Sequence, residues 1–177
     1  MEKALDESPL RAQLRLLARY HVWATQELQR QLQDLPEADY RRDLGLFFRS
    51  VHGTLNHLLL VERDVWLPRL REGLSPAIAL DLELEADRAA LAQQGLAAAR
   101  AWTALLDDWP EAQLLGLVHY RRRNGEAVAL RGAAVLTHVF NHGTHHRGQI
   151  SAALTALGRA APELDLIYML QREPEIV

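Results

Sequence analysis

Apolar residues recur every three or four positions along four long stretches of this chain. A helix turns by about 100° per residue, so this spacing gathers apolar side chains on one face and predicts an amphipathic α-helix. Proline, glycine and acidic turn signals separate the stretches. The four predicted helices span about residues 9–33, 46–70, 82–106 and 132–157. Because each helix must bury its apolar face, the pattern predicts an all-α fold, an antiparallel four-helix bundle.

A different pattern precedes the last helix. Residues 114–130 carry Asn124-Gly125, the strongest two-residue turn signal, between flanks that contain valine and tyrosine. This pattern predicts a short β-hairpin. After the last helix, Gly158 fits a helix C-cap, and the apolar residues 164–170 are expected to pack back on the bundle.

The last predicted helix carries four of the eight histidines within nine residues, namely His138, His142, His145 and His146. Residues three or four apart share a helix face, so several pairs could offer two imidazoles to one metal ion. Steps of about 100° place His142 and His146 inside the apolar stripe, and His138 and His145 at its outer edge. A buried imidazole without a partner costs about 1–3 kcal/mol. The pattern therefore favours His142 and His146 as an inward-facing pair of metal ligands.

Two ligands do not make a tight site, so a third is expected from a facing helix. In the second predicted helix, His52 and His57 lie on opposite edges of the apolar face, and the angles do not choose between them. Glu62 falls near the middle of this face, where a carboxylate must be hydrogen-bonded, paired or linked to a metal. His21 lies beside the apolar stripe of the first helix and is expected to be a surface or edge histidine.

Length and composition limit the class of protein. The chain has 177 residues, 49% hydrophobic and 24% charged, which predicts one globular domain over residues 1–177. Its net charge of −3 argues against nucleic acid or an anionic membrane as the main partner. Cysteine is absent, which excludes disulfides and thiolate ligands. The charged N-terminus and the absence of any apolar run near 18 residues predict a cytoplasmic protein without signal peptide or membrane span.

Three segments carry a recognisable combination of residues. They are Thr54-Leu-Asn-His57 followed by Glu62 and Trp66, then Asn141-His142-Gly-Thr-His145-His146-Arg-Gly-Gln149, and finally Leu164-Asp-Leu-Ile-Tyr168. In these segments the chain resembles the DinB family, DNA-damage-inducible proteins of the DinB/YfiT-like group of metalloenzymes. The resemblance covers nearly the whole chain.

The resemblance implies a bundle with up-down-down-up connectivity, commonly assembled as a homodimer. It also implies a divalent metal held by three histidines, one from the second helix and two from the fourth. By position these are His57, His142 and His146, so the resemblance favours His57 over His52. The family name records induction by DNA damage and not DNA binding, and the acidic chain gives no support for a nucleic acid partner.

Three neutral imidazoles leave at least one coordination position open, as in catalytic metal sites. The leading hypothesis is a metal-dependent enzyme that hydrolyses a small substrate or, as the resemblance implies, activates a low-molecular-weight thiol for S-transfer or isomerisation. Glu62, His138 and His145 are candidates for proton transfer or for hydrogen-bonding a metal ligand. Relatives often carry aspartate in place of Glu62, and asparagine is expected in place of His21.

The metal and the activity have alternatives. A site built from imidazoles suits zinc or nickel best, with iron, manganese or copper as alternatives. The rival to an enzyme is a non-catalytic, stress-induced metal- or ligand-binding protein that serves as a dimeric scaffold. An open coordination position that a small molecule can reach would favour the enzyme, and a sealed metal would favour the scaffold.

Overall fold

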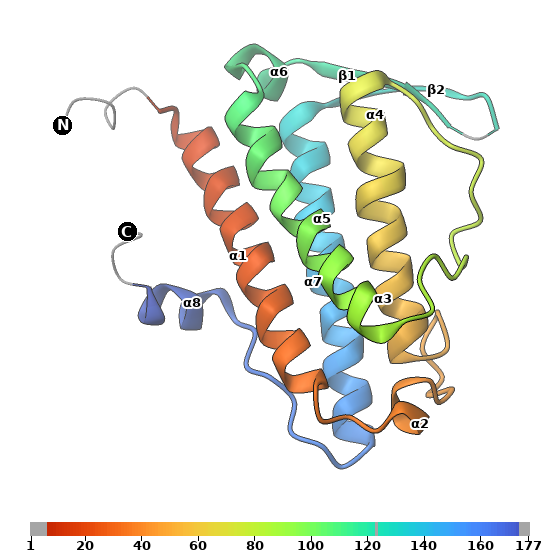
Figure 1. The fold of residues 1–177 in the computed structure, drawn as a ribbon. Helices are drawn as coiled ribbons and strands as arrows, with labels where there is room; N and C mark the ends of the chain where they lie inside the picture. Colours follow the sequence, from red (N-terminus) through yellow and green to blue (C-terminus); the bar gives the residue numbers. More distant parts are fainter. Residues whose placement is uncertain (1–6, 123, 174–177) are drawn as a thin grey trace.

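The computed structural model describes residues 7–122 and 124–173 (Figure 1). This part of the chain is mostly helical and includes a two-stranded antiparallel sheet. Residues 1–6 of the charged N-terminus and residues 174–177 of the predicted 1–177 domain lie outside the described residues. None of the helices in the described ranges is long and apolar enough to cross a membrane.

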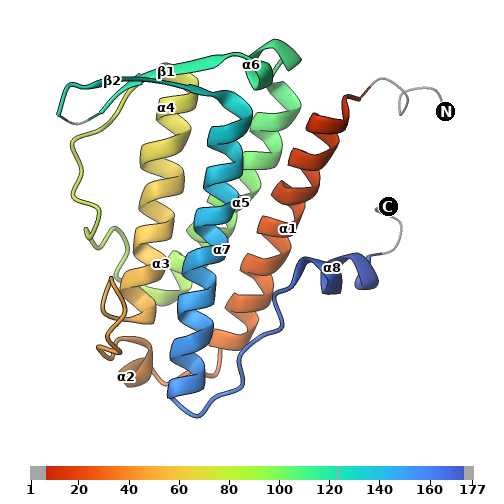
Figure 2. The same ribbon diagram turned by 180° about the vertical axis from the view of Figure 1, so that it is seen from behind.

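Each of the four predicted helical stretches is helical in the structure. The second is a continuous segment in which a π-helical stretch, η1, joins α3 to α4. The long segments lie side by side, with α1 and α7 running in one direction and the α3–α4 segment and α5 in the other (Figure 1 and Figure 2). The helices are α1 Pro9–Leu32, α2 Glu37–Tyr40, α3 Val51–Leu59, η1 Leu60–Trp66, α4 Leu67–Glu72, α5 Arg88–Asp108, α6 Glu111–Leu115, α7 Gly132–Ala156 and α8 Leu166–Arg172.

Two helices begin later than the predicted positions 46 and 82. Helix α3 begins at Val51, where the Ser50 hydroxyl caps the first turn, and α5 begins at Arg88, where the Asp87 carboxylate does the same. Such caps satisfy N–H groups that have no partner within the helix. The apolar residues ahead of these caps, which extended the periodic pattern, belong to connecting loops.

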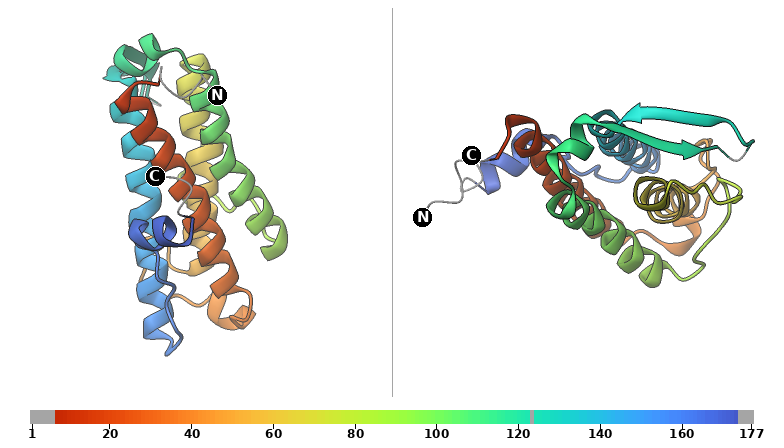
Figure 3. Two further views of the ribbon diagram at one scale, coloured as in Figure 1. Left: turned by 90° about the vertical axis from the view of Figure 1, so that its left-hand side faces the viewer. Right: turned by 90° about the horizontal axis from the view of Figure 1, so that it is seen from above.

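The predicted β-hairpin is confirmed. Strand β1 (Leu117–Arg121) pairs antiparallel with β2 (Ala127–Arg131) along its whole length. Gly125 takes a φ of 83° in the turn, a left-handed conformation that favours glycine. Tyr120 of β1 is buried. Seen from above, the hairpin and α6 lie across one end of the long helices (Figure 3).

Apolar side chains from all four long segments form the core. Trp102 of α5 is fully buried and meets Phe140 of α7 edge to face. The predicted return of the C-terminal tail is also confirmed, because Met169 of α8 is fully buried against Tyr20 and Trp23 of α1.

The π-helical stretch alters the geometry of the second segment. Its hydrogen bonds reach back five residues, as from the Leu67 N–H to the Glu62 carbonyl. A π turn holds more residues than the 3.6 of an α-helix, so angles counted at about 100° per residue no longer apply there. Glu62 lies in this stretch and is only 4% exposed. π-Turns occur frequently at functional sites.

The loop between α4 and α5 is fixed to α3 by one buried asparagine. The Asn56 Oδ1 atom accepts hydrogen bonds from the N–H groups of Leu84 and Glu85, at 2.8 and 2.9 Å, and its Nδ2 donates to the Glu85 carbonyl at 3.1 Å. This loop passes along the outside of the second segment (Figure 1). It brings the Leu80 carbonyl within hydrogen-bonding distance of His57.

We expect Asn56→Ala to destabilise the fold by about 1–3 kcal/mol, because the N–H groups of two half-buried residues, Leu84 and Glu85, lose their acceptor. Urea unfolding of the metal-free protein measures this loss. The matched control is Asn141→Ala, an exposed asparagine on α7, for which we expect a change within about 0.5 kcal/mol. Equal losses in the two variants would contradict a fixing role for Asn56.

Candidate metal centre

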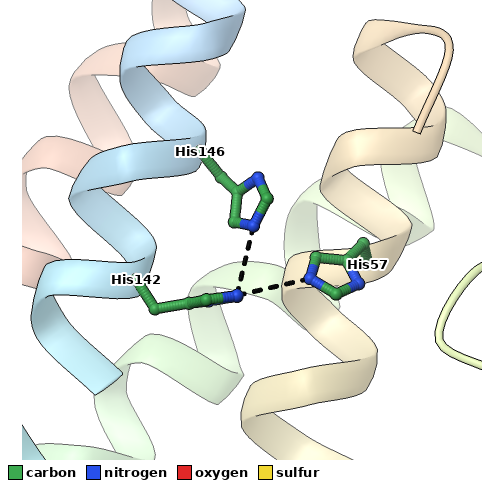
Figure 4. Close-up of side chains that lie close together, drawn as sticks. All are labelled: His57, His142 and His146. Atoms are coloured by element: carbon green, nitrogen blue, oxygen red, sulfur yellow. Dashed lines mark hydrogen bonds between the residues drawn. The ribbon is translucent and has the colours of Figure 1, made fainter. Parts of the chain in front are cut away.

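Three histidines from two facing helices meet inside the structure. His57 of α3 and His142 and His146 of α7 point their Nε2 atoms at one another (Figure 4). The Nε2 atom of His142 lies 3.4 Å from that of His57 and 3.1 Å from that of His146. All three ring nitrogens lie within 4.8 Å of one another. His57 and His146 are buried, and His142 is half-buried.

Hydrogen bonds on the far side of two rings fix where their protons sit. The Nδ1 atom of His57 donates to the Leu80 carbonyl at 2.9 Å, since a carbonyl oxygen can only accept. The Nδ1 atom of His146 donates to Gln149 Oε1 at 2.7 Å. A neutral imidazole carries one proton, so the Nε2 atoms of His57 and His146 both present lone pairs to the centre.

Burial keeps these imidazoles neutral. Desolvation, together with the charges of the neighbouring histidines, lowers the pKa of His57 to about 4 and the pKa of His142 to about 3. Burial also lowers the pKa of His146. At pH 7 the three rings are therefore in the form that binds metal ions.

The distances fit a divalent metal. Zinc binds imidazole nitrogen at about 2.0–2.1 Å, so two ligands of a tetrahedral ion lie about 3.3 Å apart. The separations of 3.4 and 3.1 Å lie on either side of this value. A buried group of three imidazoles with this spacing can hold a metal ion.

An aromatic ring covers one side of the group. Phe48, in the loop before α3, stacks on His57 with ring centroids 3.7 Å apart and lies 5.6 Å from the ring of His146. The preceding loop residue, Phe47, is 82% exposed. Phe48 thus limits the side from which a small molecule can approach His57.

His52 does not join the three histidines. Its Nε2 atom lies 3.1 Å from Asn56 Nδ2 and 3.4 Å from a carboxylate oxygen of Glu83, and its ring packs against Tyr40. Of the two histidines that the helical angles left equivalent, His57 is the one that meets His142 and His146.

His138 and His145 lie beside the group without entering it. His138 packs edge to face on Trp66, and its ring centroid is 5.8 Å from that of His142. His145 is exposed, with its ring centroid 5.0 Å from that of His146. Both histidines are exposed, as expected from their positions at the edge of the apolar stripe.

Glu62 is buried and satisfied by neighbours other than the three histidines. Its Oε2 atom accepts hydrogen bonds from His21 Nε2 at 3.0 Å and from Trp102 Nε1 at 3.2 Å. Burial alone would raise the pKa of this carboxyl, but the electrostatic attraction and hydrogen bond of His21, with the Trp102 hydrogen bond and the charge of Arg147, outweigh burial and hold its pKa below the usual value. Glu62 is therefore a buried carboxylate at neutral pH.

The expectation that His21 is a surface or edge histidine is wrong. His21 is 1% exposed, because its ring fills a space beside Gly143 and hydrogen-bonds to Glu62 and Arg147. The angle of His21 on α1 alone does not reveal such partners, which come from other helices.

Sequence reasoning missed three neighbours of the histidines. Gln149 stands three residues after His146, a spacing that brings side chains together on a helix, so its role was detectable. The Leu80 carbonyl and the Phe48 ring come from loops, and no periodic pattern indicates where a loop residue will lie.

Comparison with known proteins identifies the family of this chain. The chain matches the model of the DinB family over residues 3–175. It is similar to Protein DinB of Bacillus subtilis (strain 168), with 27% identity over 166 residues, which cover 90% of this chain and 95% of the relative. No solved structure matches it significantly. The family match spans both helices that carry the three histidines, and the chain belongs to the DinB family.

Proposed function

We propose that this protein binds one divalent metal ion through His57, His142 and His146. The observation that carries the proposal is the meeting of lone pairs at the centre of the group. His142 can donate a single ring proton to only one of its two neighbours, so at least one contact between nitrogens lacks a proton. Buried acceptors that face one another without a proton are unfavourable, and a cation removes the conflict.

We further propose that the bound ion is catalytic. Three protein ligands leave a coordination position open, and a divalent ion there would act as a Lewis acid toward a water or a thiol. The reaction would be hydrolysis of a small substrate or activation of a low-molecular-weight thiol for S-transfer or isomerisation. Because the chain has no cysteine, a thiol would have to arrive with the substrate.

The surrounding side chains have defined parts in this proposal. Leu80 and Gln149 hold the Nδ1 protons of two ligands and so keep their Nε2 atoms free for the ion. Phe48 keeps water from one face of His57. Zinc or nickel suits the three imidazoles best, with iron, manganese or copper as alternatives.

Several finer features belong to the same proposal. They are a single domain over residues 1–177, a four-helix bundle with up-down-down-up connectivity, assembly as a homodimer, a cytoplasmic location and induction by DNA damage. The side-by-side packing of α1 and the α3–α4 segment with α5 and α7 supports the bundle. Nucleic acid is not proposed as a partner.

The second candidate function is a non-catalytic metal-binding scaffold. The stacking of Phe48 on His57 favours it, because a covered metal is less accessible to substrate. Addition of a small thiol to the zinc-loaded protein distinguishes the catalytic site from the non-catalytic scaffold. A thiol that competes with water for the open position should displace no zinc but should change the zinc affinity, whereas a sealed metal should not respond.

We expect the wild-type protein, dialysed against Zn²⁺, to retain about one ion per chain, since three ligands surround a single position. His57→Ala, His142→Ala and His146→Ala should each lose it. The matched control is His119→Ala, because His119 is exposed on the hairpin. Elemental analysis gives the stoichiometry. Full zinc retention by any of the three variants would refute this ligand set.

We expect Gln149→Ala to weaken zinc binding by about 10–100-fold, because His146 loses the acceptor that orients its ring. Competition with a chelating dye measures the dissociation constant. Gln13→Ala, on the exposed side of α1, is the control and should leave the constant unchanged. An unchanged constant in Gln149→Ala would show that this hydrogen bond does not orient the ligand.

The metal-free protein should lose stability as the pH falls from about 6.5 toward 4. His57 and His142 have lowered pKa values in the folded protein, about 4 and about 3. In this window the unfolded chain therefore binds protons that the folded chain does not, and acid favours unfolding. Above about pH 6.5 both states are neutral at these positions and this effect disappears.

Urea unfolding at pH 7, 6 and 5 in the presence of a chelator measures the effect. His142→Gln, which cannot gain a proton, should show a shallower decline than the wild type between pH 7 and 5. Parallel declines would mean that His142 is not the source of the acid sensitivity.

A further inference from the structure

A second buried cluster of polar side chains lies next to the three histidines. It consists of His21, Glu62, Trp102 and Arg147, which come from α1, η1, α5 and α7. All four are buried, with exposed fractions between 0% and 4%. Each long helical segment thus contributes one side chain to what we call the buried polar cluster.

The hydrogen bonds in this cluster run in one direction. Arg147 can only donate, so its NH1 group donates to His21 Nδ1 at 3.0 Å. His21 then carries its proton on Nε2 and donates to Glu62 Oε2 at 3.0 Å. Trp102 Nε1 also donates to this oxygen, at 3.2 Å. One histidine therefore connects a buried guanidinium to a buried carboxylate in a fixed arrangement.

The cluster needs a glycine on the metal-bearing helix. A Cβ atom at Gly143 would lie 2.5 Å from His21 Cε1, 2.8 Å from His21 Nδ1 and 3.0 Å from Arg147 NH1. These distances leave no room for a side chain. Glycine inside a helix lowers its stability, so a glycine at the middle of α7 requires a reason. The reason here is the close approach of His21.

The residues of the cluster are neighbours of the three histidines in sequence. Gly143 follows His142 and Arg147 follows His146, so each pair differs by about 100° around α7. Glu62 stands five residues after His57 on the second segment. The same two helical segments therefore meet twice, once through the three histidines and once through the buried polar cluster.

Stability alone does not account for such a cluster. Buried ion pairs lose much of their attraction to desolvation, and apolar replacements often stabilise a protein equally well or better. Within the described residues, the Nε atom of Arg147 is buried without a hydrogen-bond partner, which adds a further cost. Polar networks of this kind are better suited to fixing one arrangement of helices than to adding stability.

We propose that the buried polar cluster positions the metal centre, an inference that rests on the metal-binding function proposed above. It holds α7 at one rotation and height against α1 and the second segment. His142 and His146 then keep their distance from His57 when no ion is bound. The histidines cannot do this themselves, because His142 supplies only one proton for two neighbouring lone pairs.

The test compares two glycines of α7. Gly143→Ala forces His21 out of its place, whereas Gly148→Ala adds a methyl group with no atom within 4 Å. The dissociation constant for Zn²⁺ is measured by competition with a chelating dye at a temperature where urea unfolding shows each metal-free variant to be folded. We expect Gly143→Ala to bind Zn²⁺ about 10–100-fold more weakly than wild type, and Gly148→Ala to bind it as wild type does.

A second variant covers the case in which Gly143→Ala does not fold. Glu62→Gln keeps the size of the side chain but removes the charge that joins His21 and Trp102. It too should weaken Zn²⁺ binding while the protein remains folded. In the His21→Ala variant the cluster is already broken, so adding Gly143→Ala or Glu62→Gln to it should weaken Zn²⁺ binding no further. That result would identify the cluster as the common cause of both effects.

The outcomes are distinct. A merely structural cluster would lower the unfolding free energy of the folded variants and leave their Zn²⁺ dissociation constants within about twofold of wild type, because the constant refers to the folded state. That result would overturn the positioning role and leave the metal-binding function intact. A wild-type protein that binds no Zn²⁺ would overturn both.

Discussion

The structure depends on the burial of one carboxylate where its four long helical segments meet. Glu62 cannot remain ionised inside the protein without donors, and these come from His21 on α1, Trp102 on α5 and, through His21, Arg147 on α7. A carboxylate left without them would cost several kcal/mol, as breaking a buried pair does. The need to satisfy Glu62 therefore restricts how α1, α5 and α7 can rotate against the second segment, much more sharply than apolar contacts do.

The three histidines beside Glu62 are uncharged at neutral pH, whereas Glu62 is ionised. Burial favours the neutral form of His57 and His142 and lowers their pKa values, whereas hydrogen bonds and a nearby cation keep Glu62 charged. Neutral imidazoles are what a divalent ion requires, because a protonated ring cannot bind it. The protein thus places a charged cluster and an uncharged ligand group side by side. Hydrogen-bond donors keep Glu62 charged, and burial keeps the histidines neutral.

The sequence predicted the parts of this arrangement that depend on regular periodicity. The helical angles singled out His142 and His146, since α7 is a regular α-helix over that stretch. They could not choose between His52 and His57, and only family resemblance favoured His57. They placed His21 at the surface or edge of the bundle, because they carry no information on its partners, which belong to other helices. The pattern of apolar residues carries no information on tertiary contacts. It therefore missed the π-helical stretch, the two capped helix starts and the loop positions of Phe48 and Leu80.

The residues from His142 to Arg147 are best understood as two interleaved pairs. His142 and His146 are four residues apart and face the metal position, while Gly143 and Arg147 are also four apart and face His21. The second pair is the first shifted by one residue, or about 100° around the helix. A rotation of α7 that moved the histidines away from His57 would therefore also move Gly143 and Arg147 away from their places beside His21. Because both faces share one rigid helix, fixing either face fixes the other.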